Sequence, residues 1–286
     1  MKSIINYSKF VKFEHTIFAL PFAFIGFFFA LQLNDNTNFN IKLLLFVLLC
    51  MIFARNAAMG FNRYLDRKID ILNPRTASRE IPAGIIKPKS ALSFVIINSI
   101  LFITTTWFIN KLCFFLSPVA LFVILFYSFT KRITPLCHFV LSLGLSIAPV
   151  GAYLAVAEKF DWLPVVLGGV VFFWVSGFDI IYALQDEDFD KDQNLKSIPA
   201  LLGKKQALNF AKIIHLLSAI LVVGVALLTP ANLIHWIGTS IFIGLLFFQH
   251  TMVRHNDLSK VNLAFFTTNG LASVIYGILV ITSLLI

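Results

Sequence analysis

The stretch Asn62-Arg63-Tyr64-Leu65-Asp66-Arg67-Lys68-Ile69-Asp70 follows a long apolar run and places an amide and two carboxylates four residues apart. An α-helix has 3.6 residues per turn, so positions i, i+4 and i+8 lie on one face. The spacing therefore predicts that Asn62, Asp66 and Asp70 present three oxygen ligands in a row at the mouth of a membrane helix. We call these three residues the first acidic row.

A second acidic row, formed by Asp179, Asp186 and Asp190, lies later in the chain. Asp186 follows Asp66 by 120 residues, and Asp190 follows Asp70 by the same number. Each row is followed by an Asn, a basic residue and the tripeptide Ile-Pro-Ala. This pattern resembles a parallel internal repeat. It predicts two Asp-rich loops, at about 59–89 and 183–207, on the same side of the membrane and able to face each other.

The rest of the 286-residue chain is strongly apolar, with 58% hydrophobic and 13% charged residues and a mean hydropathy of +0.86. An average soluble domain has about 25% charged residues. Because the apolar runs are continuous and about 20 residues long, they predict an all-α polytopic membrane protein and disfavour a β-barrel. We interpret residues 1–286 as a single membrane-embedded domain with about nine transmembrane helices. The predicted spans are 14–33, 41–58, 90–109, 113–130, 133–156, 163–182, 208–229, 232–250 and 262–285.

Positive charge is distributed unevenly over these spans. Of the 23 Lys and Arg residues, 19 precede the first span or follow even-numbered spans, and three lie on the other side. The positive-inside rule therefore predicts that the N-terminus and both Asp-rich loops face the cytoplasm, and we expect a bacterial inner membrane. This placement of basic residues in loops on one side of the membrane also explains the net charge of +9. We therefore expect the lipid bilayer as a partner and exclude nucleic acid as one. The three cysteines show no metal spacing, which argues against disulfides and a zinc site.

A solvated charge cluster would explain one acidic row, but it does not readily explain two rows at equal offsets. Mg²⁺ prefers oxygen ligands and is usually held by one or two carboxylates together with substrate phosphates. Basic side chains near the rows would bind the remaining phosphate oxygens, which favours a metal-diphosphate site over a cation channel. The candidates for this contact are Arg63, Arg75, Arg79, Lys131, Arg132 and Lys196.

A substrate with a diphosphate head and a long apolar tail would suit a site at the bilayer surface, because its tail could lie among the spans. If the diphosphate leaves an allylic carbon, metal neutralisation promotes its departure. Aromatic faces such as those of Tyr64, Tyr127 and Tyr182 could then shield the allyl cation until an electron-rich ring attacks it. This last step is a hypothesis, since spacing alone indicates only a metal-phosphate site.

An arginine within a predicted span is costly and requires a partner. Arg55 lies two helical turns before Asn62, so we expect it either to pair with an acidic residue, with Glu14 as one candidate, or to bind an acceptor carboxylate. His15 and His138 lie at the starts of spans, and we interpret them as interfacial or helix-bonded residues rather than substrate contacts.

The motifs Asn62-x-x-x-Asp66-x-x-x-Asp70 and Asp179-x-x-Tyr182-Ala183-x-Gln185-Asp186-x-x-x-Asp190 resemble the two signature motifs of the UbiA superfamily of intramembrane prenyltransferases. The segment Tyr127-Ser-Phe-Thr-Lys131-Arg132 after the fourth span adds to the resemblance. It implies Mg²⁺-dependent transfer of a polyprenyl group from polyprenyl diphosphate to an aromatic acceptor. It also implies that Lys131 contacts the diphosphate and that Asp179 assists. The residues implied to bind metal and diphosphate are Asn62, Asp66, Asp70, Asp186 and Asp190, the four aspartates being the catalytic residues.

The second motif, together with Asn73-Pro-Arg-Thr and Lys12-Phe-Glu14-His15-Thr, is similar to the branch that prenylates 4-hydroxybenzoate in ubiquinone synthesis. The segments 177–182 and 197–200 also resemble bacterial relatives that act in menaquinone synthesis on a naphthoate, 1,4-dihydroxy-6-naphthoate. We therefore expect an enzyme of respiratory quinone biosynthesis, with 4-hydroxybenzoate as the first choice of acceptor. Position 63 departs from the family pattern, since Arg63 stands where many members have an acidic residue or Cys.

Other classes of protein remain open at this point. A secondary transporter would suit the repeat, but it predicts charges near the span centres, whereas these charges gather at one membrane face. A CDP-alcohol phosphotransferase also uses intramembrane Asp pairs, but its Asp-Gly and Ala-Arg elements are missing before the row. Prenyl transfer of the haem or chlorophyll type remains open within the superfamily.

Overall fold

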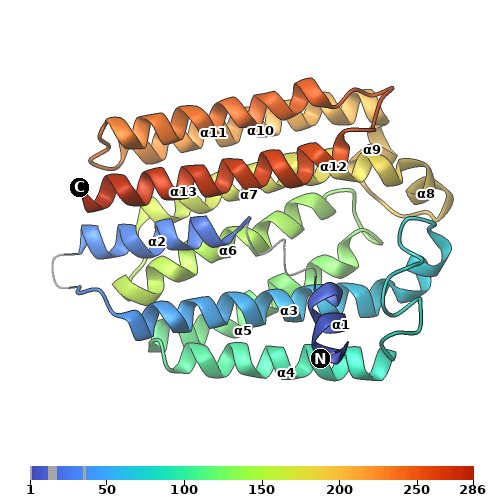
Figure 1. Cartoon of the computed structure of the whole chain (residues 1–286), viewed down its shortest axis with the longest axis horizontal. Coiled ribbons are helices and arrows are strands. Elements are labelled where there is room, and N and C mark those ends of the chain that lie inside the picture. The colour runs from blue at the N-terminus through green and yellow to red at the C-terminus, as the bar shows by residue number, and fades with distance from the viewer. Residues whose placement is uncertain (1, 12–17, 35–36) are drawn as a thin grey trace. The chain divides into compact units, whose positions relative to one another are not determined.

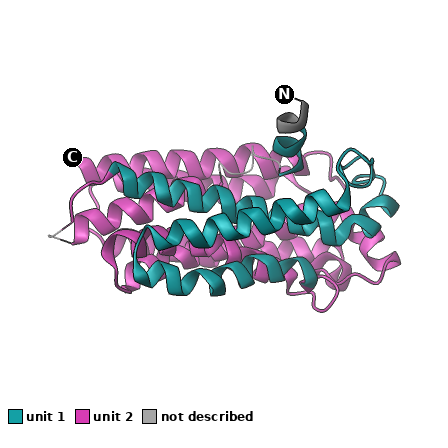
Figure 2. Cartoon of the chain, turned by 90° about the horizontal axis from the view of Figure 1, so that it is seen from below, with its two compact units in different colours: residues 1–16, 41–129 teal, residues 17–40, 130–286 magenta. Residues whose placement is uncertain are grey.

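The computed structural model describes residues 2–11, 18–34 and 37–286 (Figure 1). Within these ranges the chain is helical, and its only β-type pairing is an isolated bridge between Arg254 and Asp257. The all-α prediction is therefore confirmed. The chain divides into two compact units, which Figure 2 shows in different colours. Unit 1 comprises residues 1–16 and 41–129, and unit 2 comprises residues 17–40 and 130–286.

Eight helical stretches among the described residues are long and apolar enough to cross a membrane, which confirms the polytopic fold. A ninth apolar helix, α2 (Leu20–Leu33), has only 14 residues, so the count of nine spans stays a prediction. The predicted start of that span, residues 14–17, lies outside the described residues, and so do Glu14 and His15.

Unit 1 is built from the longest helix of the chain and its neighbours. Its helices are α1 (Lys2–Phe10), α3 (Ile41–Leu72), α4 (Pro88–Trp107) and most of α5 (Lys111–Thr130). α4 packs along α3, and the Asn56 side-chain amide donates a 3.0 Å hydrogen bond to Asn98 Oδ1 between them. Within a membrane, hydrogen bonds between polar side chains help to hold neighbouring helices together.

The helix α3 corrects two predicted boundaries. The second span was expected to end at residue 58 and the Asp-rich loop to begin at 59, whereas α3 continues to Leu72. Loss of apolar character does not end the helix, because polar side chains four residues apart pair along its face. The helix stops just before Asn73-Pro74, since a residue that precedes proline avoids the α conformation. The first acidic row therefore lies on the helix itself.

Unit 2 contains the remaining helices. They are α2, α6 (Cys137–Ala157), α7 (Trp162–Ala183), α8 (Glu187–Asp192), α9 (Ile198–Leu202), α10 (Lys204–Leu227), α11 (Leu233–Met252), α12 (Val261–Leu263) and α13 (Asn269–Leu285). A 3₁₀ turn (Leu184–Asp186) joins α7 to α8, and a π-helical turn (Ala264–Thr268) precedes α13. α7 lies at the centre of the unit and packs against both α6 and α10.

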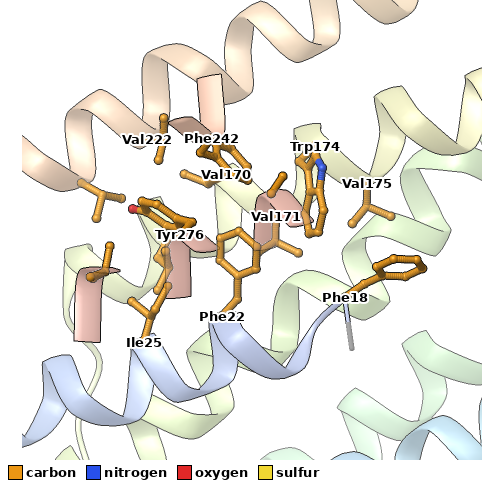
Figure 3. Packing of buried hydrophobic residues seen from close by; sticks show 14 of the residues in the cluster. Phe18, Phe22, Ile25, Val170, Val171, Trp174, Val175, Val222, Phe242 and Tyr276 are labelled. Carbon is orange, nitrogen blue, oxygen red and sulfur yellow. The ribbon is translucent and has the colours of Figure 1, made fainter. Parts of the chain in front are cut away.

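The core of unit 2 surrounds Trp174, a fully buried residue of α7 (Figure 3). Its ring centroid lies 5.2 Å from those of Phe22 and Phe178 and 5.8 Å from that of Phe242. Its indole nitrogen donates a 2.9 Å hydrogen bond to Asn269 Oδ1, which satisfies the one polar atom of the ring. One side chain thus links α2, α7, α11 and α13.

Large apolar side chains also point away from the helix contacts. Trp162 is 82% exposed, Leu233 is 74% exposed and Phe115 is 72% exposed. A protein surrounded by water rarely carries so much exposed apolar surface, whereas lipid tails match it. These side chains agree with the membrane location that the helix lengths indicate.

A close helix crossing gives a first testable prediction. A Cβ atom at Gly26 of α2 would collide with the backbone carbonyl of Pro149 in α6. We expect Gly26→Ala to destabilise the protein by about 1–3 kcal/mol, because the two backbones must separate. Thermal unfolding in detergent would measure this, with Gly151→Ala as the control because a Cβ at Gly151 meets no atom within 4 Å. Equal unfolding temperatures for both variants would contradict the prediction.

Candidate metal and diphosphate site

The first acidic row lies on one face of α3 in unit 1, as the four-residue spacing predicts. The Asn62 side-chain amide donates a 3.1 Å hydrogen bond to Asp66 Oδ2, and both Asp66 and Asp70 are buried. Arg79 Nη1 forms a 2.8 Å ion pair with Asp70 Oδ1. The other oxygen, Asp70 Oδ2, is buried without a hydrogen-bond partner among the described residues. Buried polar atoms usually have a partner, so this oxygen fits a metal ligand.

The chain that follows α3 folds back onto the row. The Thr76 hydroxyl donates to the backbone carbonyl of Asp70 at 3.1 Å, and Asn73 Oδ1 accepts from the backbone N–H of Arg75 at 2.9 Å. These local bonds hold the loop against the end of α3, where Arg79 reaches the Asp70 carboxylate. Arg75 is exposed and Arg79 is about one-quarter exposed.

Arg63 has a partner that the sequence did not predict. Its guanidinium forms a 2.7 Å ion pair with Glu80 Oε2 and lies 6.0 Å from the ring centroid of Phe10. It is buried, with a side chain only 4% exposed. In this structure Arg63 therefore fastens the loop to α3, and its role as a diphosphate contact stays a prediction.

Arg55 and Tyr127 lie close enough in unit 1 for an electrostatic interaction between them. Arg55 is half-buried in the apolar part of α3, and Tyr127 is half-buried near the end of α5. Tyr64, which was also expected to shield the allyl cation, stacks against Arg67, whose guanidinium carbon lies 4.5 Å from its ring centroid. The role of Tyr64 toward the substrate stays a prediction.

The second acidic row lies in unit 2 and does not follow one straight helix. Asp179 is on α7, Asp186 ends the 3₁₀ turn and Asp190 is on α8. Asp190 is buried, accepts a hydrogen bond from the Ser197 hydroxyl, and has Lys131 and Asp186 as electrostatic neighbours. The structure thus brings two carboxylates and the predicted lysine together.

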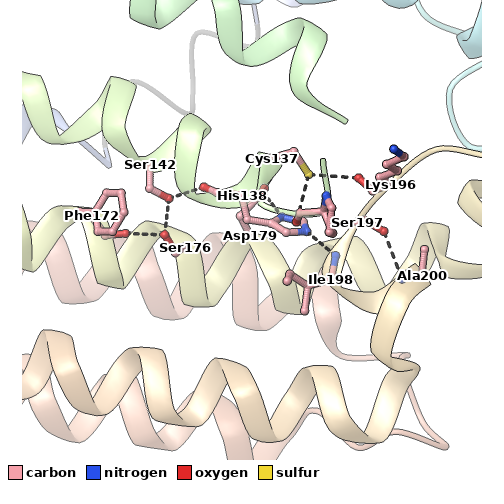
Figure 4. Close-up of polar contacts among 11 residues, drawn as sticks. Cys137, His138, Ser142, Phe172, Ser176, Asp179, Lys196, Ser197, Ile198 and Ala200 are labelled. Carbon is pink, nitrogen blue, oxygen red and sulfur yellow. Dashed lines mark hydrogen bonds and ion pairs between the residues drawn. The ribbon is translucent and has the colours of Figure 1, made fainter. Parts of the chain in front are cut away.

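Two segments of unit 2 are hydrogen-bonded to each other next to Asp190. Figure 4 shows one of these contacts, in which the Cys137 thiol donates to the backbone carbonyl of Lys196 at 3.4 Å. The backbone N–H of Lys196 donates to the carbonyl of Lys131 at 2.6 Å, and the Lys196 ammonium donates to the carbonyl of Ile133 at 2.9 Å. Lys196, a predicted diphosphate contact, is therefore engaged with the backbone here. Arg132 is half-buried in the same turn as Lys131.

The aromatic candidate of unit 2, Tyr182, packs against Phe265 with ring centroids 4.2 Å apart. Phe265 also contacts Phe178 at 5.2 Å and Phe18 at 5.7 Å. Phe178 and Tyr182 lie on α7, one residue before and three residues after Asp179, so an aromatic wall lies on the same helix as the first residue of the second acidic row.

The donor set of each unit fits Mg²⁺ only in part. No group of three or more His, Cys, Asp or Glu side chains in the described ranges converges closely enough to hold a metal alone. Mg²⁺ does not require such a group, because substrate phosphates and water complete its shell of six oxygens. Each unit offers two candidate carboxylates beside a cation, Asp66 and Asp70 with Arg79 in unit 1, and Asp186 and Asp190 with Lys131 in unit 2.

The sequence missed the residues that hold the rows in place. Glu80 and Ser197 occupy equivalent positions, each directly before Ile-Pro in one copy of the repeat. Glu80 binds Arg63, a neighbour of the first acidic row, and Ser197 binds Asp190, a member of the second. Aligning the two copies on their Ile-Pro pairs would have identified this shared position.

Comparison with known proteins gives one consistent result. The model of the UbiA prenyltransferase family matches residues 19–271. A 4-hydroxybenzoate octaprenyltransferase of Aliivibrio fischeri (strain MJ11) is 30% identical over 240 residues, which are 82% of this chain and 81% of that protein.

Solved structures agree with this family assignment. The apo structure of a UbiA homolog from Aeropyrum pernix K1 has a TM-score of 0.84 and 30% identity, covering 94% of this chain and 98% of that chain. A UbiA homolog from Archaeoglobus fulgidus, bound to DMAPP and Mg²⁺, has a TM-score of 0.74 at 20% identity, over 97% and 99% of the two chains, and supports the fold alone. This chain therefore belongs to the UbiA prenyltransferase family and is a prenyl-transferring membrane enzyme.

Proposed function

We propose that this enzyme transfers a polyprenyl group from polyprenyl diphosphate to 4-hydroxybenzoate, in a Mg²⁺-dependent reaction of respiratory quinone biosynthesis. The observation that carries the proposal is the pairing of buried carboxylates with a cation in each unit, Asp70 with Arg79 and Asp190 with Lys131. The curated relatives support the acceptor, since they are named 4-hydroxybenzoate octaprenyltransferases. The site is expected to face the cytoplasm, because most basic residues lie in the loops on that side.

Each acidic row would supply metal ligands in its own unit. The oxygens of Asn62, Asp66 and Asp70 would be the ligands in unit 1, and those of Asp186 and Asp190 would be the ligands in unit 2. Mg²⁺, when bound, neutralises the charge that develops on the departing diphosphate. Arg79 in unit 1 and Lys131 in unit 2 would each offer a positive charge to phosphate oxygens, and Arg75 and Arg132 are further candidates for this contact.

The aromatic side chains serve the apolar part of the reaction. The wall formed by Tyr182, Phe265 and Phe178 excludes water and presents ring faces to the allylic end of the substrate. Arg55 binds the carboxylate of the acceptor, with Tyr127 as its neighbour.

The test is prenyl transfer by the protein reconstituted in liposomes, with Mg²⁺ and geranyl diphosphate. 4-Hydroxybenzoate and 1,4-dihydroxy-6-naphthoate are supplied in parallel, and we expect product with the benzoate that chelation of Mg²⁺ abolishes. Product with the naphthoate alone would move the enzyme to menaquinone synthesis. No product with either acceptor, together with solute uptake by the same liposomes, would favour a transporter.

The role of Arg55 gives a separate prediction. A hydrogen-bonded charge pair contributes about 1.5–3 kcal/mol, so Arg55→Ala should raise the KM for 4-hydroxybenzoate by about 10–100-fold. Phenol lacks the carboxylate, and its use should change little. Arg67→Ala on the same helix is the control, because Arg67 contacts Tyr64 instead. Equal losses with both acceptors would show that Arg55 does not bind the carboxylate.

A further inference from the structure

His138 is a buried histidine of α6 to which the proposed reaction gives no role. Its Nδ1 lies 2.6 Å from Asp179 Oδ2, and its Nε2 lies 3.3 Å from the backbone nitrogen of Ile198 (Figure 4). The ring is only 3% exposed. A single side chain thus connects α6 to α7 and to the first residue of α9.

The two contacts fix the tautomer of the ring. A backbone N–H can only donate a hydrogen bond, so the Ile198 N–H requires Nε2 to be the acceptor. When the ring is neutral, its proton therefore sits on Nδ1 and is donated to the Asp179 carboxylate. His138 therefore acts as a directional link, with a donor on one side and an acceptor on the other.

The first contact orients Asp179, the first residue of the second acidic row. In the part of the chain that the structure describes, His138 is the only hydrogen-bond or ionic partner of this carboxylate. The Asp179 side chain is 23% exposed, and its Oδ1 is not engaged by another side chain. Because His138 holds Oδ2, the direction of Oδ1 is also fixed. Hydrogen-bonded partners orient the carboxylates of metal sites in the same way.

The second contact reaches the other end of the row. Ile198 directly follows Lys196 and Ser197 in the chain. The Ser197 hydroxyl binds Asp190, and the backbone N–H of Lys196 donates to the Lys131 carbonyl. Fixing the Ile198 N–H therefore fixes the segment that carries the hydrogen bond to Asp190. The ring of His138 touches one end of the second acidic row directly and reaches the other through two residues.

We propose that His138 is a positioning residue for the second acidic row, which it orients through Asp179 on one side and through Ile198 and Ser197 on the other. This inference rests on the proposed function, since it takes the row to bind a metal and a diphosphate. His138 itself touches neither.

Two substitutions that each replace one ring nitrogen by an amide atom separate the two contacts. The side-chain nitrogen of Asn lies as many bonds from Cβ as Nδ1 does, so His138→Asn keeps a donor for Asp179. The side-chain oxygen of Gln lies as many bonds from Cβ as Nε2 does, so His138→Gln keeps an acceptor for Ile198. His138→Ala removes both contacts, and His255→Ala, in an exposed loop, is the control.

The experiment measures Mn²⁺ binding by electron paramagnetic resonance in the full-length, detergent-solubilised protein with geranyl diphosphate. Loss of a group that orients metal ligands typically weakens binding 10–100-fold, and we expect about tenfold weaker binding for His138→Ala. His138→Asn and His138→Gln should each recover part of the loss. The concentration of Mg²⁺ that gives half-maximal prenyl transfer should rise in the same order, with a smaller change in kcat.

Parental binding of Mn²⁺ by all three variants would overturn the proposal. Equally weakened Mn²⁺ binding in all three variants would also overturn it, because keeping the contact to Asp179 or the contact to Ile198 would then recover nothing. If His138→Ala does not fold, the Asn and Gln variants decide by the same criteria. If Mn²⁺ binding is weakened by the His138 substitutions but the parent protein transfers no prenyl group, only the proposed function is contradicted, whereas a parent protein that binds no Mn²⁺ would overturn both.

Discussion

Replacing Asp186 with Asn is expected to lower the rate of prenyl transfer by at least about 100-fold. Loss of a group that only orients a metal ligand already lowers activity by about 10–100-fold, and a ligand itself should matter more. Asp186 lies beside Asp190, with Lys131 as the neighbouring cation, and the amide would remove the charge that a Mg²⁺ ligand needs. Asp66→Asn should produce a loss of the same order from the first acidic row. Initial rates in liposomes at saturating Mg²⁺ measure both effects.

The chain offers a closely matched control for this experiment. Asp188 lies between Asp186 and Asp190 in sequence, but its side chain is 83% exposed and pairs with Lys204 at 3.3 Å. Exposed ion pairs contribute little, so Asp188→Asn should keep the parental rate within about twofold. Similar losses in the Asp186 and Asp188 variants would contradict a specific metal-ligand role, as would a near-parental rate in the Asp186 variant.

Truncating Trp174 to Ala is expected to have the largest effect on stability, a loss of about 3–5 kcal/mol in the free energy of unfolding. The indole is fully buried among Phe22, Phe178 and Phe242, and its removal also leaves Asn269 without the bond it accepts. The cavity would open at the point where α2, α7, α11 and α13 meet. Denaturant titration in mixed micelles measures the change.

Trp162 is the control for this prediction, because it lies on the same helix with a side chain that is 82% exposed. Substitutions at exposed positions usually change stability by no more than about 0.5 kcal/mol, and we expect Trp162→Ala to stay near that value in detergent. If the Trp174 and Trp162 variants unfolded at the same denaturant concentration, the packing around Trp174 would not stabilise unit 2 as described.

Features that depend on local spacing were predictable from the sequence. Apolar run length predicted the membrane helices, and the four-residue spacing predicted that Asn62 and Asp66 share a face, which their hydrogen bond confirms. The span was predicted to end at residue 58, whereas the helix α3 continues to Leu72, because hydropathy marks where a helix leaves the bilayer and not where it stops being helical. The stop signal was the proline at position 74.

Features that depend on distant segments were not predictable. His138 and Asp179 are 41 residues apart, and no periodicity indicates that their side chains meet. The sequence also gave no sign that the backbone changes from α7 to a 3₁₀ turn between Asp179 and Asp186. Both outcomes follow from how α6, α7 and α9 pack, which a one-dimensional pattern does not contain.

The exposed tryptophans have a spectroscopic consequence. Trp107 ends α4 and Trp162 begins α7, with side chains that are 64% and 82% exposed. Indole rings at the ends of membrane helices prefer the level of the lipid headgroups. Brominated lipids should therefore quench the fluorescence of these two rings, whereas the emission of the enclosed Trp174 should persist. The enzyme thus carries intrinsic optical probes that distinguish its contact with the bilayer from the integrity of its interior.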